Sequence, residues 1–127
     1  MYNAKGTTKS RILLVVSNDL IRDIFMKLFE RSGYYIVALD MARDGLKALK
    51  DECFDIVICD FDLYDSTGLE FFNSIKNICP EKTNILMITH GDLVNITAEE
   101  RLNIHYVIEK PFPFEELLTI VENTFKK

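Results

Sequence analysis

The sequence lacks the features that mark several common classes of protein. No apolar run approaches the roughly 18 residues that a membrane-spanning helix needs. Residues 1–10 are polar and lack the apolar segment of a signal peptide. There are 15 lysines and arginines against 20 acids, a net charge of −5, and no basic stripe. A membrane protein, a secreted precursor and a direct nucleic-acid binder are therefore all disfavoured.

Cysteine and histidine are few and scattered. Cys53, Cys59 and Cys79 lack the spacing of metal ligands, and Cys59 lies inside an apolar run, as a small core residue does. The two histidines, His90 and His105, fall on different predicted elements, so no ligand cluster is visible. Reduced thiols in a chain without an export signal indicate the cytoplasm.

What the sequence does contain is a regular alternation of strands and helices. Its 127 residues, 48% hydrophobic and 28% charged, fit one globular domain with a sizeable core. Such alternation predicts a parallel sheet with right-handed crossovers and helices on both faces. The predicted strands are residues 11–16, 35–39, 55–60, 84–89 and 105–109. The predicted helices are one that starts at Leu20 and stops at Gly33, one marked by Ala42, Leu46, Ala48 and Leu49 before Cys53, one over 68–78, a short one from Thr97, and one over 114–125.

Local signals refine this outline. Asp19 is expected to cap the first helix and Gly33 to end it. Gly45 costs the second helix roughly 1 kcal/mol relative to alanine. The strand at residues 35–39 is less hydrophobic than the others, so we expect it nearer the edge of the sheet. Residues 1–10 are predicted to be a flexible leader.

Three of the predicted strands lead to reactive polar residues. One apolar run stops at Asp60, another at Thr89, and a third ends shortly before Lys110. The carboxyl ends of parallel strands share one edge of a sheet, and that edge is where open α/β folds bind ligands. We therefore expect a carboxylate, a hydroxyl and an ammonium group to converge.

These groups suit phosphoryl transfer. A carboxylate at such an edge can attack phosphorus and form an acyl phosphate. The reaction needs positive charge around the phosphoryl oxygens, normally from Mg²⁺ and a lysine, and Mg²⁺ prefers carboxylate, carbonyl and water oxygens. Asp60 is accordingly the predicted nucleophile, Thr89 a donor to one phosphoryl oxygen and Lys110 the cation that neutralises another.

The chain resembles the receiver domains of two-component response regulators, and the resemblance covers residues 11–126. It implies a flavodoxin-like (CheY-like) five-stranded parallel sheet of order 2-1-3-4-5 flanked by five helices, with the receiver domain over residues 11–127. Lys110 is followed by the proline whose bond is commonly cis in the family. The segments that carry the likeness are Arg11–Tyr34, Asp55–Asp60, Thr67–Glu70 and Lys110–Phe112.

The resemblance also implies roles and partners. Asp60 would be the phosphoacceptor, Thr89 the switch hydroxyl and Lys110 the charge partner, with Asp60 and the backbone carbonyl of Asp62 as metal ligands. A sensor histidine kinase or a phosphotransfer protein would donate the phosphoryl group. An output domain or downstream protein would read the face formed by the fourth helix, fifth strand and fifth helix. Such a module is regulatory and is not a turnover enzyme.

The family's acidic pair is missing from this chain. It falls on Val16 and Ser17, which cannot supply the carboxylates that hold Mg²⁺. Asp62 could compensate, as could Asp19 if it does not cap the helix. Mg²⁺ binding at Asp60 is therefore expected to be weak or absent.

Other departures lie near the fifth strand. His90 follows the switch threonine where the family usually keeps alanine or glycine. The switch aromatic position falls on Val107, and Tyr106, one place earlier, should face the opposite side of the sheet because strand side chains alternate.

Two mechanisms and one further class stay open. Asp60 could accept phosphate, or the domain could be a degenerate receiver that binds partners, with Lys110 held in a permanent salt bridge to Asp60. The further class is a small phosphatase or flavin-binding protein on the same fold. No phosphate-binding loop rich in Ser, Thr and Gly follows the first strand, and that strand carries no nucleophilic Asp or Cys.

Overall fold

The computed structural model describes residues 10–78, 84–89 and 104–125. Residues 1–9, most of the predicted leader, lie outside this range, as do Cys79, His90 and the short helix expected from Thr97. None of the described helices has the length and apolar character needed to cross a bilayer. The elements are β1 Arg11–Val15, α1 Asp19–Arg31, β2 Tyr35–Leu39, α2 Ala42–Asp51, β3 Ile56–Asp60, α3 Gly68–Ile78, β4 Asn84–Thr89, β5 Tyr106–Glu109 and α5 Phe114–Phe125.

The strands form one parallel sheet in the order β2-β1-β3-β4-β5. This confirms the predicted fold class and strand order. Within the described residues, the observed strands and helices differ from the predicted ones only at their ends. β2 lies at the edge of the sheet, as its lower hydrophobicity indicated.

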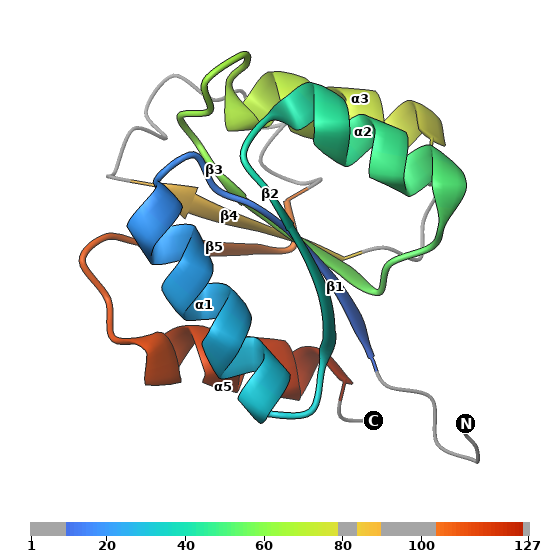
Figure 1. The fold of residues 1–127 in the computed structure, drawn as a ribbon. Coiled ribbons are helices and arrows are strands. Elements are labelled where there is room, and N and C mark those ends of the chain that lie inside the picture. Colours follow the sequence, from blue (N-terminus) through green and yellow to red (C-terminus); the bar gives the residue numbers. More distant parts are fainter. Residues whose placement is uncertain (1–9, 79–83, 90–103, 126–127) are drawn as a thin grey trace.

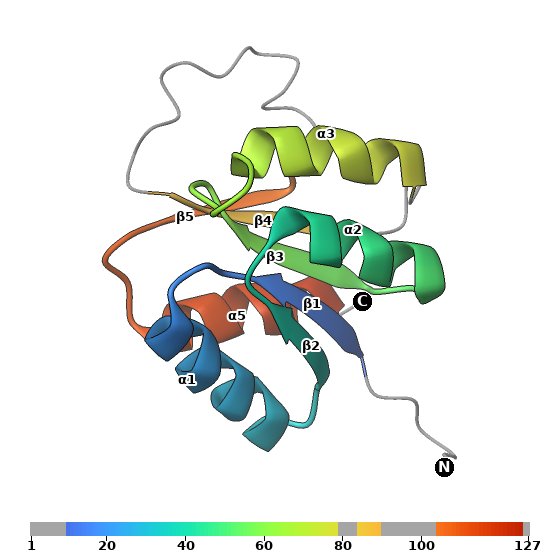
Figure 2. The same ribbon diagram turned by 45° about the horizontal axis from the view of Figure 1, so that its top comes forward.

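The helices cover both faces of the sheet. Figures 1 and 2 show α2 and α3 on one face, and α1 and α5 on the other. Because side chains alternate along a strand, each buried strand contributes to two separate cores. Tyr106 packs against the core under α1 and α5, and Val107 against the core under α2 and α3, so the prediction that they face opposite sides is confirmed.

Asn18, and not the predicted Asp19, caps α1. The Asn18 backbone is extended, and its Oδ1 accepts a hydrogen bond of 2.9 Å from the N–H of Ile21. Asp19 is the first helical residue, and its carboxylate pairs with Arg22 at 2.7 Å. The prediction was wrong because the chain turns into the helix one residue earlier than expected. Gly33 follows α1 with φ of +94°, consistent with the predicted end of the helix.

Gly45 lets α2 lie close to the sheet and to α3. A Cβ at this position would lie 2.9 Å from Cζ of Phe71 and 3.0 Å from Cγ2 of Val15. Both neighbours are core residues, 1% and 0% exposed, so neither can move aside easily. Gly45 therefore lowers the helix propensity of α2 but allows the close contact of α2 with β1 and α3.

Candidate functional site

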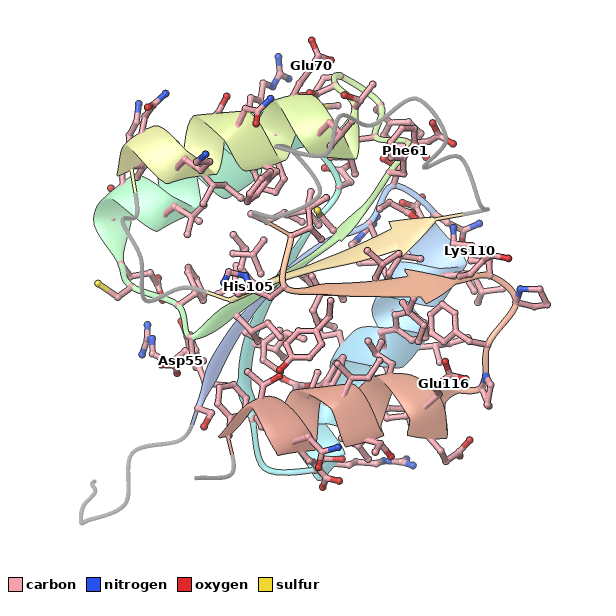
Figure 3. The ribbon with its side chains drawn as sticks, turned by 180° about the vertical axis from the view of Figure 1, so that it is seen from behind. Asp55, Phe61, Glu70, His105, Lys110 and Glu116 are labelled. Carbon is pink, nitrogen blue, oxygen red and sulfur yellow. The ribbon has the colours of Figure 1, made fainter. Side chains whose placement is uncertain are left out.

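The residues singled out in the sequence lie at one edge of the sheet. β3 ends at Asp60, which pairs in register with Ile88, the residue before Thr89. Thr89 in turn pairs with Glu109, the residue before Lys110. Figure 3 shows Phe61 and Lys110 toward this end of the sheet and Asp55 at the other. The backbone of Thr89 is described, whereas its side chain lies outside the described part of the structure.

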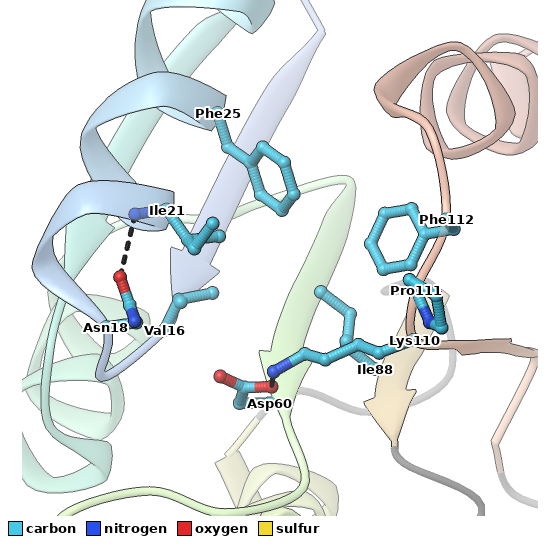
Figure 4. Close-up of a pocket in the computed structure, with 9 residues that line it drawn as sticks. All are labelled: Val16, Asn18, Ile21, Phe25, Asp60, Ile88, Lys110, Pro111 and Phe112. Atoms are coloured by element: carbon cyan, nitrogen blue, oxygen red, sulfur yellow. Dashed lines mark hydrogen bonds and ion pairs between the residues drawn. The ribbon is translucent and has the colours of Figure 1, made fainter.

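Asp60 and Lys110 form an ion pair at this edge. Nζ of Lys110 lies 2.9 Å from Oδ1 of Asp60 (Figure 4). The Asp60 side chain is 9% exposed, while the Lys110 side chain is 30% exposed. The carboxylate is therefore nearly enclosed, whereas the lysine side chain is partly exposed to solvent. The structure thus contains the salt bridge considered for Lys110 from the sequence.

The ion pair lies in a pocket of about 450 Å³ between α1 and the loop after β5 (Figure 4). The Lys110–Pro111 peptide bond that leads into this loop is cis. A pocket of this size is within the range of sites that hold small ligands. Its apolar walls are Val16, Ile21, Phe25, Ile88, Pro111 and Phe112, and Asn18 adds an amide group.

The donor groups around the pocket do not fit Mg²⁺. Asp60 is the single carboxylate among the described lining residues. Val16, 1% exposed, forms part of the apolar wall. Across the described ranges, no group of three or more His, Cys, Asp or Glu side chains is placed to hold a metal ion. Asp62, considered for its backbone carbonyl, lies in the β3–α3 loop and bridges through its backbone to Thr67.

Ser17, at the second position of the missing acidic pair, is used in another way. It is 7% exposed, and its Oγ donates to the carbonyl oxygen of Asp40 at 3.1 Å. The same Oγ accepts from the backbone N–H of Tyr64 at 2.9 Å. This hydroxyl therefore joins the end of β1 to the loops that follow β2 and β3.

Asp65, in the β3–α3 loop, caps α2 from a distance in sequence. Its carboxylate accepts from the N–H groups of Ala42 at 2.8 Å and Arg43 at 3.1 Å, while the N-cap residue Met41 makes no side-chain bond. Partial burial raises the pKa of the Asp65 carboxyl, but the N–H groups of Arg43 and Ala42 outweigh it and hold the pKa below its ordinary value.

Sequence reasoning missed three of these contributors: the Ser17 link, the Asp65 cap and Arg22. Nη1 of Arg22 donates to the carbonyl oxygen of Val16 at 2.8 Å and so places a positive charge at the end of β1. For Asp65, the only available signal was its place in a run of turn-forming residues, Asp65-Ser66-Thr67.

Two other reactive residues do not take part in the site. Burial raises the pKa of Cys59 to about 12, with a further contribution from the Asp60 carboxylate, so this thiol is a poor nucleophile. Cys59 points into the core under α2 and α3. His105 is exposed and precedes β5, at the opposite end of that strand from Lys110 (Figure 3).

Comparisons with known proteins agree on one family. Residues 12–122 match the family model described as the response regulator receiver domain. The chain is similar to the DNA-binding transcriptional regulator NtrC of Proteus hauseri, with 30% identity over 115 residues, which cover 90% of this chain and 24% of NtrC. It is also similar to the response regulator receiver protein CpdR of Brucella abortus, with 25% identity over 113 residues that cover 88% of this chain and 93% of CpdR.

A solved structure shows the same architecture. The signal receiver domain of an HD domain-containing protein from Pseudomonas fluorescens superimposes with a TM-score of 0.82 and 25% identity, covering 98% of this chain and 92% of that one. The chain spans about a quarter of the length of the first curated relatives it matches.

Proposed function

This chain belongs to the response regulator receiver domain family, and from that premise we propose that it is a signalling module whose Asp60 accepts a phosphoryl group. The observation that carries the proposal is the pairing of Asp60 with Lys110 at the carboxyl edge of the sheet. A nucleophile and a cation that can neutralise a phosphoryl oxygen stand there in one pocket. The proposed donor is a sensor histidine kinase or a phosphotransfer protein.

In the proposed step, a carboxylate oxygen of Asp60 attacks the phosphorus of the partner's phosphohistidine. The new O–P bond forms as the P–N bond breaks, and the imidazole leaves with the electron pair and takes up a proton from solvent. The Lys110 ammonium shifts from the carboxylate to a phosphoryl oxygen and stabilises its charge. The proposed switch hydroxyl is that of Thr89, which would donate to another phosphoryl oxygen.

Two observations favour a second candidate, a degenerate receiver that recognises partners without being phosphorylated. Lys110 already neutralises Asp60, and Val16 and Ser17 stand where the family carries its metal-binding acids. In such a domain the ion pair would hold the site in one state, and the surface presented to partners would be constant.

Either candidate is regulatory and needs a partner that reads its state. The proposed recognition face includes β5 and α5, together with the fourth helix expected within the region that the structure leaves undescribed. We place the module in the cytoplasm because Cys53 and Cys59, the two cysteines among the described residues, are free thiols.

The test is intact-mass spectrometry after incubation with acetyl phosphate and Mg²⁺. One added phosphoryl group is expected on the wild type and on Asp44→Asn, a control that changes an exposed acid of α2. Asp60→Asn should remove the adduct. An adduct that persists in Asp60→Asn would refute Asp60 as the acceptor. A wild type that stays unmodified with acetyl phosphate and with phosphorylated donor proteins would favour the degenerate receiver.

A further inference from the structure

The Ser17 hydroxyl connects segments that are distant in sequence. Asp40 lies 23 residues away and Tyr64 lies 47 residues away, in the β2–α2 and β3–α3 loops. Both loops border the edge that carries Asp60. One nearly buried hydroxyl therefore crosslinks three strand ends of the sheet at the site.

A carboxylate could not make the same crosslink. The serine hydroxyl donates one hydrogen bond and accepts another, and it uses both functions here. An ionised aspartate at position 17 would only accept, so it would face the carbonyl oxygen of Asp40 without a donor. A side chain at position 17 can either form this pair of hydrogen bonds or act as a cation ligand. Ser17 forms the hydrogen bonds.

The charges nearby also disfavour a divalent cation. The guanidinium of Arg22 lies against the carbonyl oxygen of Val16, at the end of the strand where the acids would stand. The Lys110 ammonium lies against Asp60 on the other side of the pocket. Lys110 is therefore the cation in contact with the single lining carboxylate, while Arg22, which also pairs with Asp19, adds a positive group at the end of β1.

From these contacts we infer that Ser17 is a positioning residue that replaces a metal ion as the crosslink between β1 and the β3–α3 loop. The site then keeps its geometry without a divalent cation, and Lys110 supplies the positive charge. The inference rests on the proposed function in treating this edge as the signalling site. It predicts that the order of the loop at Tyr64 does not respond to Mg²⁺.

The test follows the Tyr64 amide by ¹⁵N NMR and hydrogen exchange. In the wild type, millimolar Mg²⁺ should move neither the Tyr64 resonance nor its exchange rate. Ser17→Ala should speed Tyr64 exchange about fivefold or more, because its hydrogen bond is lost. The matched control is Ser74→Ala, which removes only a local bond to the Glu70 carbonyl oxygen within α3 and should leave Tyr64 unchanged. A saturable Mg²⁺ shift in the wild type, or unchanged exchange in Ser17→Ala, would overturn the inference.

A second variant covers the case in which Ser17→Ala does not fold. Ser17→Asp should bind Mg²⁺ with a saturable shift of amides in the β3–α3 loop, where the wild type shows none. If Ser17→Asp responds to Mg²⁺ no more than the wild type does, the inference fails.

Phosphorylation separates this inference from the proposed function. Asp60 labelling of similar extent in Mg²⁺ and in EDTA supports both. Labelling that requires Mg²⁺ overturns the inference and leaves Asp60 as the acceptor. An unlabelled protein whose Tyr64 amide is protected equally with and without Mg²⁺ supports the Ser17 link and argues against phosphorylation.

Discussion

Replacing Lys110 by methionine should destabilise the fold more than replacing Asp60 by asparagine, although each change removes the same ion pair. Lys110→Met keeps the length of the side chain and leaves the Asp60 carboxylate, on a side chain that is 9% exposed, without its cation. Asp60→Asn leaves an ammonium group on a side chain that is 30% exposed, and this group can extend into solvent. The asymmetry follows from the different depths of the two charges.

The magnitude can be worked from the geometry. At 2.9 Å the attraction between the two charges is about 6 kcal/mol for an effective dielectric constant of about 20, much of it offset by desolvation. Removing one partner of a buried pair costs about 3–5 kcal/mol. Because Lys110 is partly solvated, we expect about 2–3 kcal/mol for Lys110→Met, and about 1 kcal/mol or less for Asp60→Asn.

Urea unfolding followed by circular dichroism measures both changes, with midpoints compared at equal slope. Lys47→Met, which alters an exposed lysine of α2, controls for the loss of one positive charge. The double variant should lose less stability than the sum of the single variants, since the two residues are in contact. Equal losses in the two single variants, or a Lys110→Met loss no larger than that of Lys47→Met, would refute the reasoning.

Three further changes test the surroundings of the site. Gly45→Ala should lower the free energy of unfolding by about 1 kcal/mol, because overpacking exceeds the gain in helix propensity; stabilisation in urea would contradict the close contact. Asp65→Ala should cost about 1 kcal/mol at neutral pH. Because folding lowers the Asp65 pKa, the stabilisation from this carboxylate is present above the ordinary pKa of 3.8 and is lost as pH falls through the folded pKa. The melting temperatures of the wild type and Asp65→Ala should therefore converge in acid. A difference that stays constant with pH would count against the cap. In a Cys53→Ser, Cys79→Ser background, Cys59 should react with Ellman's reagent only after unfolding, because its thiol is fully buried and has a pKa of about 12. Reaction in the native state would place Cys59 outside the core.

The edge that carries Asp60 and Lys110 could be predicted because it depends on strand direction and hydrophobicity alone. A strand buried on both faces reads as a continuous apolar run, and the first polar residue after it marks where the strand reaches the surface. Parallel pairing then brings such residues to the same edge. The family resemblance added their proposed roles.

Contacts between loops could not be predicted in the same way. Ser17 bonds to a backbone carbonyl and a backbone N–H, and such groups occur along the whole chain, so no residue type identifies the partners. The prediction of which residue caps α1 was wrong for a related reason. Ser17, Asn18 and Asp19 are all good capping residues, and only the point where the chain leaves β1 determines which of them caps the helix.

The carboxylate of Asp65 makes the first turn of α2 depend on a segment that follows β3. A biosensor built by inserting a fluorescent module into that segment would therefore fray a helix that the insertion never touches. Among the described residues, the exposed turn around Gly33, at the other end of the sheet, carries no such cross-element cap, so it is the better site for an insertion.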